Sequence, residues 1–366
     1  MKIGILTYHR VYNYGATLQA VALRLFLENL GHQVFYIDYY PEYHRQMYKA
    51  FDTRSLRRGG LKAKLYGLYI NLKYYQGRRA RIKAYKPFIE KQIAPYCIQD
   101  EREQYDVIVY GSDQIWRKQP GLNQSFNPIY FGKNNYRGKR QISYAASMGN
   151  LNLSDAERAF LQETLSRLEA VGVREKDLYD VLKPFNLSNL HLTLDPTMLL
   201  KPEEWDHALQ TKRLIDSPYV LYYKVRESFK EEYIERFCRE KGVRLVKVLP
   251  FDRPSGSDYH PSPAEFVSLI KYADFVLTSS FHGLAFSIIY RKELLVSIGS
   301  NSERLKGLMD SLGIGERFVP YGSPIPSDVC PIDYEDVHGR LEALQEDSSH
   351  FLAGAISSVM HTPISM

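Results

Sequence analysis

The sequence is poor in cysteine. Its three cysteines, Cys97, Cys238 and Cys330, are odd in number and far apart, and none belongs to a CxxC pair. This pattern argues against both a disulfide framework and a zinc site, and it fits a reducing cytoplasm. We therefore expect a cytoplasmic protein that carries no metal.

Long apolar runs and several cofactor motifs are also absent. No window approaches eighteen consecutive apolar residues, and the opening MKIGILTY has no cleavable signal region, so we expect no membrane span. The patterns GxGxxG, GxxxxGK[ST], HExxH and GxSxG do not occur as site motifs, which removes support for dinucleotide, P-loop, zinc-protease and α/β-hydrolase sites. Transfer chemistry without a metal or a cofactor remains.

The apolar residues indicate strands alternating with helices. A strand at Lys2–Tyr8, a helix at Ala16–Leu30 and a strand at Gln33–Tyr39 form a βαβ unit, which predicts a parallel sheet with ligands at the carboxyl ends of its strands. After Asp195-Pro196 the pattern starts again. With 366 residues, the chain exceeds the usual size of a single core, so we predict two α/β domains at 1–198 and 199–333, then a C-terminal helix and tail at 334–366.

The remaining predicted elements follow the same alternation. Further strands are predicted at Tyr105–Tyr110, Gln141–Tyr144, Ala170–Val173, Leu190–Leu194, Tyr219–Lys224, Arg244–Leu249, Asp274–Leu277 and Glu293–Ile298. Further helices are predicted at Lys230–Lys241, 262–272, Phe281–Tyr290, Glu303–Leu312 and Tyr334–Ser357.

Positive charge is concentrated in one segment. Between Arg45 and Lys91 there are fourteen Lys or Arg residues against Asp52 and Glu90, whereas the whole chain has a net charge of only +6. The apolar spacing in 45–92 predicts two or three helices inserted into the first domain, with breaks at Gly59, Gly60 and Gly77. A helical segment that combines Lys and Arg with Leu and Tyr is typical of peripheral binding to anionic membranes, although a solvated helical face or an insertion packed on the sheet are the ordinary alternatives.

The strongest local candidate for chemistry is TSSFHGLAFS at 278–287, where a buried strand ends and a helix begins near His282. Such a junction offers free backbone N–H groups to a phosphate or carboxylate, and His282 can exchange a proton there. An equally weighted interpretation is that Ser279 or Ser280 only caps the helix and His282 fills a loop.

Other polar residues follow predicted strands at the same edge: Gly111-Ser112-Asp113, Arg174-Glu175 and Asp195. An Arg at a strand end can hold a carboxylate or phosphate with two N–H groups. From the residues alone, a salt bridge of Arg174 with Glu175 or Asp177 is the more ordinary interpretation, and Asp113 and Asp195 are more typical of turn caps than of catalytic acids.

Six motifs in order resemble those of the polysaccharide pyruvyl transferase family. They are NYGATLQA (13–20), VIVYGSDQIW (107–116), ISYAASMG (142–149), VGVRE (171–175), LDPTMLL (194–200) and TSSFHGLAFSI (278–288), which together span most of the chain. The resemblance implies two Rossmann-like domains facing a cleft, similar to GT-B glycosyltransferases, and phosphoenolpyruvate as a co-substrate that donates pyruvate to a sugar as a ketal.

The resemblance also implies roles for individual residues. His282 matches the catalytic histidine of the family and Arg174 its donor-binding arginine, with Ser280, Phe281 and Gly283 beside the donor. Where well-studied members carry an Arg two residues before the histidine, this chain has Ser280, so the missing charge is expected from Arg304, Lys306 or Arg291. The expected acceptor side of the cleft comprises Asn13, Tyr14, Gly15, Gly111, Ser112 and Asp113.

The partners expected from the family are phosphoenolpyruvate and a sugar or lipid-linked glycan of a capsule or exopolysaccharide precursor, with 45–91 on the cytoplasmic membrane surface. Two other functions stay open at this point: a GT-B glycosyltransferase that uses a sugar nucleotide, and a nucleic-acid-binding module based on the basic segment, although we expect no nucleic acid.

Overall fold

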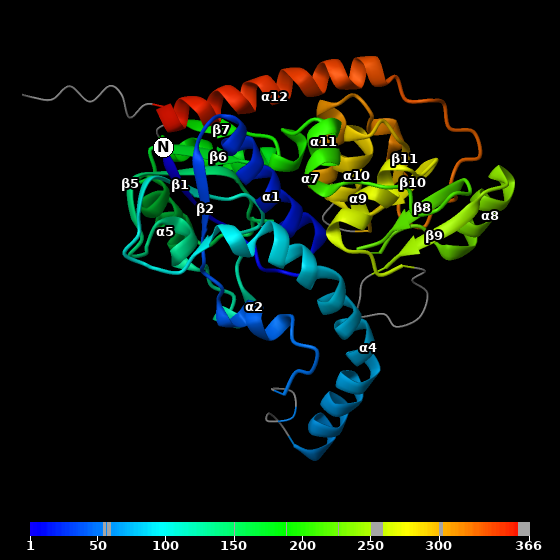
Figure 1. Cartoon of the computed structure of the whole chain (residues 1–366), viewed down its shortest axis with the longest axis horizontal. Coiled ribbons are helices and arrows are strands. Elements are labelled where there is room, and N and C mark those ends of the chain that lie inside the picture. Colours follow the sequence, from blue (N-terminus) through cyan, green and yellow to red (C-terminus); the bar gives the residue numbers. More distant parts are fainter. Residues whose placement is uncertain are drawn as a thin grey trace, which may run out of the picture.

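The fold is described from a computed structural model of the chain. It describes residues 1–53, 56, 60–149, 151–187, 189–225, 227–249, 259–299 and 303–357. Within the last of these ranges, side chains are described from Leu305 onward. Two parallel sheets lie beside each other, and helices cover them (Figure 1).

The first sheet has seven strands in the order β3-β2-β1-β4-β5-β6-β7, and all its pairings are parallel. Its central strands are almost wholly buried, as expected for a parallel sheet with helices on both faces. The strands are β1 (Lys2–Leu6), β2 (Gln33–Ile37), β3 (Cys97–Ile98), β4 (Gln104–Tyr110), β5 (Arg137–Ala146), β6 (Ala170–Val173) and β7 (Leu190–Leu192). Its helices include α1 (Tyr14–Asn29), α5 (Asp155–Leu165) and α6 (Lys176–Leu182).

The second sheet has four parallel strands in the order β11-β10-β8-β9. The strands are β8 (Tyr219–Tyr223), β9 (Arg244–Val248), β10 (Phe275–Thr278) and β11 (Glu293–Val296). The helices of this half are α7 (Pro202–Leu209), α8 (Glu231–Lys241), α9 (Pro263–Lys271), α10 (Phe281–Ile289) and α11 (Glu303–Ser311). The predicted α/β fold is therefore confirmed, and the domain boundaries at 198 and 333 stay a prediction.

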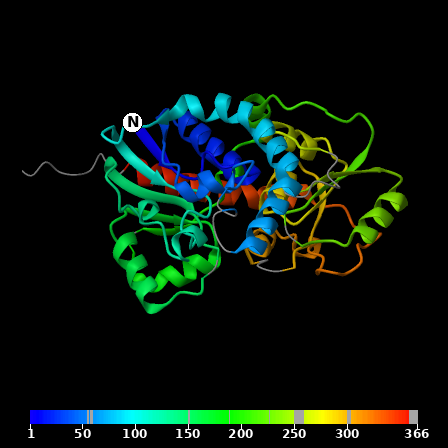
Figure 2. The ribbon, with the colours of Figure 1, turned by 90° about the horizontal axis from the view of Figure 1, so that it is seen from below.

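The two halves share one hydrophobic core. One cluster of buried side chains runs from Ile3 and Val107 in the first sheet to Leu221 and Val276 in the second. Figure 2 shows the halves side by side from below. Side chains of both sheets are thus removed from water together, which stabilises their relative position.

A long C-terminal helix, α12 (Tyr334–Ser357), crosses both halves at the top of Figure 1. In the second half, His338 Nε2 lies 3.0 Å from the carbonyl oxygen of Ile288. In the first half, the backbone N–H of Leu194 donates to Ser348 Oγ at 2.9 Å. The predicted helix at these residues, and the GT-B-like arrangement of two sheets and a terminal helix, are confirmed.

The basic segment forms α2 (Glu42–Met47) and the 32-residue helix α4 (Leu61–Gln92). The predicted break at Gly60 is confirmed, because this residue caps the start of α4, whereas Gly59 lies outside the described residues. The predicted break at Gly77 is wrong. A helical Gly costs only about 1 kcal/mol relative to Ala, and burial of Tyr85 and Phe88 at the C-terminal end of α4 outweighs that cost.

Candidate active site

The candidate site begins at the carboxyl edge of the first sheet. Asp113 follows β4, Arg174 follows β6, and Asp195 comes three residues after the end of β7. Since β4, β5, β6 and β7 are adjacent parallel strands, their carboxyl ends lie along one edge. The structure brings these three side chains together, as the sequence predicts.

His282 comes from the second half, in the first turn of α10. Ser280 is the N-cap of this helix, and its hydroxyl accepts from the N–H of Gly283 at 3.4 Å. Gly283 is needed for close packing, because a Cβ there would lie 2.3 Å from Thr278 Oγ1. The capping role of Ser280 is thus confirmed, and His282 is set at the positive end of the α10 dipole.

Arg174, Asp195 and His282 form a buried cluster where the two halves meet. Arg174 Nη1 donates to Asp195 Oδ2 at 2.6 Å, and the same oxygen lies 3.5 Å from His282 Nε2. The Arg174 guanidinium also lies 5.2 Å from the centre of the Phe281 ring. The side chains of Arg174, Asp195 and His282 are 2%, 0% and 10% exposed, so their mutual electrostatic interactions are weakly screened by water.

Asp195 joins the two halves of this cluster. Its Oδ1 accepts from the backbone N–H of Thr197 at 3.0 Å and from Thr197 Oγ1 at 2.7 Å. Burial raises the pKa of Asp195, but His282 and Arg174 lower it more strongly, and the net shift is far below the ordinary value. The sequence predicted the capping role of Asp195, and it missed the contacts with Arg174 and His282, which depend on tertiary structure.

Arg174 is surrounded by three carboxylates. Besides its bond to Asp195, its Nε donates to Glu175 Oε1 at 3.2 Å, and its Nη2 lies 3.9 Å from Asp113 Oδ1. Burial lowers the pKa of Arg174, but Glu175, Asp195 and Asp113 together raise it. The predicted salt bridge with Glu175 is confirmed, so the guanidinium is both fixed in place and largely neutralised.

Two donor atoms of the cluster remain without a hydrogen bond: Arg174 Nη2 and His282 Nε2, both fully buried. Buried polar atoms are nearly always satisfied by protein, water or ligand. Arg174 and His282 lie on either side of Asp195, and an Arg donor and a His ring nitrogen so placed can together hold an anionic oxygen and deliver a proton. This pair of atoms is the chemical core of the candidate site.

The start of α1 approaches the same histidine. A Cβ on Gly15 would lie only 2.0 Å from His282 Nδ1, so Gly15 allows the imidazole to approach the backbone of α1. Asn13 caps α1 and accepts from the N–H of Ala16 at 3.2 Å. Of the residues predicted for the acceptor side, Gly15 is thus in direct contact with the histidine.

Tyr14 connects the two halves. Its hydroxyl donates to the carbonyl oxygen of Pro261 at 2.7 Å, and its ring stacks on Phe266 with 4.4 Å between centroids. The residue is only 4% exposed. In this structure Tyr14 therefore fixes α1 against α9 instead of lining open space.

Gly111 and Ser112 build the turn behind Asp113. A Cβ on Gly111, whose φ is +129°, would lie 2.1 Å from the carbonyl oxygen of Tyr144. The hydroxyl of Ser112 donates to the carbonyl oxygen of Ala145 at 2.9 Å. Both residues are thus engaged within the first half, and Asp113 is the member of this motif that extends toward Arg174.

Three cationic residues were expected to replace the arginine that the family carries at the position of Ser280, and they lie in different places. Lys306 Nζ lies 4.8 Å above the ring of Phe318, and the side chain of Arg304 lies outside the described residues. Arg291 follows the C-terminal end of α10, about 14 Å of helix away from His282, and pairs with Glu335 at 2.7 Å. Arg291 is therefore excluded as a donor-binding residue in this arrangement.

A second polar cluster lies at the carboxyl ends of β1 and β2. Within the described residues, His9, Asp38 and Cys97 have potential metal-ligand atoms within 4.8 Å of one another. However, His9 Nδ1 faces the carbonyl oxygen of Thr7 at 3.0 Å and Nε2 faces Asp38 at 3.2 Å, so both ring nitrogens act as donors. Although burial lowers the pKa of His9, the bonds to Asp38 and Cys97 raise it to about 9. In this structure His9 and Asp38 thus form a buried ion pair.

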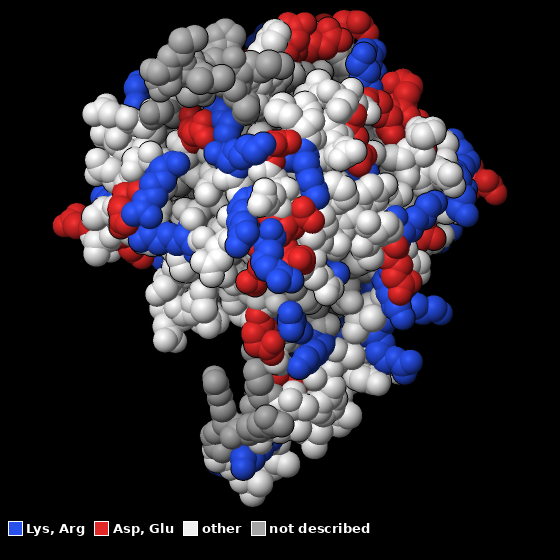
Figure 3. All heavy atoms as spheres, turned by 60° about the vertical axis from the view of Figure 1, so that its left-hand side comes forward, with Lys and Arg blue, Asp and Glu red and all other residues white. Residues whose placement is uncertain are grey.

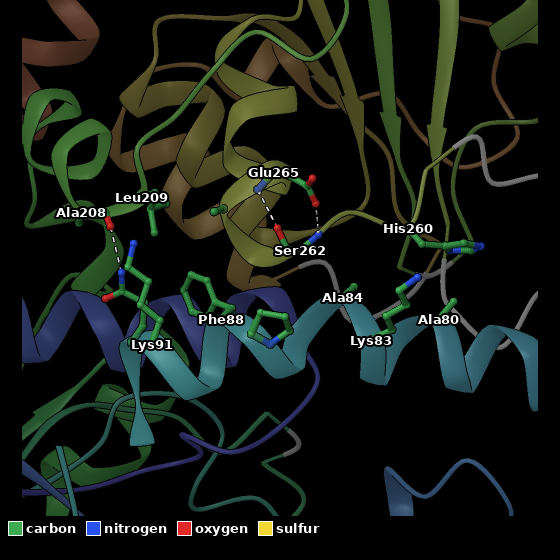
Figure 4. Close-up of a pocket in the computed structure, with 13 residues that line it drawn as sticks. Ala80, Lys83, Ala84, Phe88, Lys91, Ala208, Leu209, His260, Ser262 and Glu265 are labelled. Atoms are coloured by element: carbon green, nitrogen blue, oxygen red, sulfur yellow. Dashed lines mark hydrogen bonds between the residues drawn. The ribbon is translucent and has the colours of Figure 1, made fainter. Parts of the chain in front are cut away.

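A cavity of about 580 Å³ lies between α4 and α9, apart from the His282 cluster (Figure 4). Lys83 and Phe88 line it from α4, and Ser262 and Glu265 line it from the start of α9. The two α9 residues are already bonded to each other's backbone in a capping box. The cavity therefore offers few free polar groups from the second half of the molecule.

Comparisons with solved structures give low similarity scores. The chain is 10% identical to a UDP-N-acetylglucosamine 2-epimerase, with 100% of this chain and 97% of that chain covered and a TM-score of 0.49. It is 11% identical to the UDP-GlcNAc 2-epimerase of Methanocaldococcus jannaschii, with 96% of this chain and 99% of that chain covered and a TM-score of 0.46. It is 11% identical to the glycosyltransferase SsfS6 of Streptomyces sp. SF2575, with 95% of this chain and 96% of that chain covered and a TM-score of 0.35. At these identities and scores the resemblance carries no inference about substrate. No curated protein shows significant sequence similarity to the chain.

One family model matches most of the chain. The model of polysaccharide pyruvyl transferase covers residues 13–300, from the N-cap of α1 through the whole His282 cluster to the segment after β11. The match includes Arg174, Asp195 and His282, which the structure brings together. The chain therefore belongs to the polysaccharide pyruvyl transferase family.

Proposed function

We propose that the protein transfers pyruvate from phosphoenolpyruvate to a sugar as a cyclic ketal. Family membership supports pyruvyl transfer to a polysaccharide in general. The observation that favours this donor is a pair of nitrogens without a hydrogen bond, Arg174 Nη2 and His282 Nε2, which come from opposite halves and belong to the buried cluster around Asp195. An anion binds an Arg donor and a helix N-terminus well, and phosphoenolpyruvate carries an anionic group at each end.

The proposed reaction requires a proton at carbon three of the enolpyruvyl group. His282 donates this proton, which makes carbon two electrophilic, and a sugar hydroxyl adds there and returns its own proton to the histidine. A second hydroxyl then displaces phosphate from carbon two and closes the ketal, and its proton leaves with the phosphate. No electron is gained or lost, and no covalent enzyme intermediate or cofactor is needed.

The proposed roles divide between the halves. Arg174 binds the carboxylate or phosphate of the donor, while the start of α10 at Phe281 and Gly283 holds the other pole. Three carboxylates surround Arg174, so a second cation is needed for a highly charged donor. Lys306 and Arg304 are the proposed sources, because both belong to α11 in the same half as His282.

The acceptor is proposed to be a sugar of a capsule or exopolysaccharide precursor, carried on a lipid. Such a substrate stays at the cytoplasmic face of the membrane, so this part of the proposal implies peripheral association. No helix among the described residues is long and apolar enough to cross a bilayer.

The decisive test is phosphate release from phosphoenolpyruvate in the presence of free and lipid-linked glycans, with product analysis by mass spectrometry. We expect stoichiometric phosphate and a gain of the pyruvyl ketal mass on the glycan. In the same reaction His282→Gln is expected to lower turnover at least about a hundredfold, the usual value of general acid catalysis. Release of a nucleoside diphosphate from a sugar nucleotide, without any ketal, would instead establish the glycosyltransferase alternative.

A further inference from the structure

The first half of α4 exposes a continuous apolar stripe. Leu61, Leu65, Leu68 and Leu72 follow one another at intervals of four, three and four residues, which places them on one face of the helix. They are 74%, 58%, 39% and 64% exposed. Tyr69, at 54%, lies beside them on the same side. Single exposed leucines are ordinary, but four in line form a patch that requires explanation.

Another face of this helix is already occupied. Gly67 and Asn71 are buried there, and the Asn71 side chain bonds to the backbone N–H and carbonyl oxygen of Asp52 at 2.7 and 2.9 Å. Asn71 also accepts from Arg78 at 3.1 Å. These contacts fix the rotation of α4 about its axis, so the leucine stripe faces away from the described part of the molecule.

Lysines flank the stripe on both sides. At 100° per residue, Lys64 falls on one side of it and Lys62 and Lys73 on the other. The helix has nine Lys or Arg residues, and its single acidic residue, Glu90, lies in the last turn. Apolar residues between rows of cations are the pattern of a helix that lies in the interface of an anionic membrane.

The charge of α4 decides between a membrane and a second copy of the chain. Pairing two copies through this stripe would bring Lys62, Lys64 and Lys73 close to the same lysines of the other copy, with no carboxylate on this half of α4 to compensate. Like charges in contact are unfavourable, whereas anionic headgroups neutralise all of them. Nucleic acid would satisfy the lysines but would leave the leucines in water.

The position of α4 connects this surface with the active site. The insertion leaves the first sheet at the carboxyl end of β2, the edge at which Arg174 and Asp195 lie, and α4 returns from there to β3. Its start therefore extends beyond that edge, as the lower projection in Figure 1 shows. In Figure 3 this projection carries much uncharged surface. A membrane bound to it would lie on the active-site side of the protein.

We propose that Leu61–Tyr75 docks on anionic lipid bilayers, with the leucine stripe at the boundary of the acyl chains and the flanking lysines among the headgroups. The proposal rests on the proposed function only for the identity of the lipid-linked acceptor, and docking itself requires no catalysis. The sequence predicted membrane binding from Lys and Arg interleaved with Leu and Tyr, and the structure adds that four of the leucines form one exposed stripe.

The test is flotation of the full chain with vesicles of phosphatidylcholine, alone or mixed with phosphatidylglycerol. We expect wild type to float with the mixed vesicles, less so at high salt. Leu65→Gln, Leu68→Gln and Leu72→Gln combined should reduce binding at least tenfold at every salt concentration, while Lys62→Gln, Lys64→Gln and Lys73→Gln combined should remove the preference for phosphatidylglycerol. Gln is a good helix former, so the leucine variant retains its helix.

The matched control changes two lysines in the other half of the same helix, Lys86→Gln with Lys91→Gln, and should float like wild type. Absence of wild-type flotation at low salt, or equal flotation of the leucine variant, would overturn the proposal. So would a lipid-free dimer, measured by sedimentation, that the leucine variant loses. Pyruvyl transfer to a soluble glycan should be equal in all variants, so failure of the chemistry and failure of docking give different results.

Discussion

Asp195→Asn is the substitution that most directly tests how the two halves build the site. Asparagine keeps an oxygen for Thr197 but places an amide NH2 where Oδ2 accepts from Arg174 at 2.6 Å, so two donors face each other. Removing one partner of a buried ion pair costs on the order of 3–5 kcal/mol. We therefore expect the free energy of unfolding at pH 7 to fall by about 3 kcal/mol, measured by urea denaturation.

The same substitution should change the pH dependence of stability. The pKa of Asp195 is lowered in the folded state, so its stabilisation is present above about pH 4 and is lost as the pH falls below it. The stability difference between variant and wild type should therefore shrink below about pH 4.

The matched control is Asp206→Asn. Asp206 pairs with Lys271 at 2.7 Å, but its side chain is 33% exposed, and pairs of this kind contribute about 1 kcal/mol or less. If Asp195→Asn costs no more stability than this control and leaves the pH dependence of unfolding unchanged, Asp195 does not couple Arg174 to His282, and the reasoning fails.

Three further predictions concern the neighbours of this cluster. Arg174→Lys should raise the KM for phosphoenolpyruvate with little change in the KM for the acceptor, because an ammonium group cannot replace a guanidinium fork; a change in the acceptor KM alone would refute this role. Gly15→Ala should lower turnover at least about tenfold with an unchanged circular dichroism spectrum, since its Cβ would lie 2.0 Å from His282 Nδ1; normal turnover would show that the histidine moves freely. Because the pKa of His9 is raised to about 9, its pair with Asp38 should stabilise the fold by up to about 3 kcal/mol below pH 6.5. This stabilisation should be lost by about pH 9. A His9→Gln variant whose free energy of unfolding has the same pH dependence as that of wild type would contradict the prediction.

The sequence predicts the elements of this fold well because several of its strands are short, apolar and fully buried. AVGV at 170–173 and FVLT at 275–278 are apolar runs that end at a polar residue or turn, and both are strands in the structure. The short strand at Cys97–Ile98 was not predicted, since two residues carry no periodicity. The break expected at Gly77 was wrong because tertiary packing outweighs local propensity.

The candidate site was only partly predictable for a similar reason. The junction at His282 and the Arg after β6 are local patterns, so the sequence places each of them at a strand end. The contact between Asp195 and His282 joins residues 87 positions apart in different halves, and no local pattern encodes it. Tyr14 was predicted to line the cleft because it lies in a family motif, but its interhalf bond to Pro261 depends on the packing of α1 against α9.

The helix α12 restrains the two halves relative to each other. It is bonded to Ile288, at the end of α10, and to Leu194, the residue immediately before Asp195. Separating the halves would therefore break the bond of α12 to at least one of them. α12 thus connects the segment that precedes Asp195 with the helix that carries His282, and the 3.5 Å between Asp195 Oδ2 and His282 Nε2 depends on the angle between the halves.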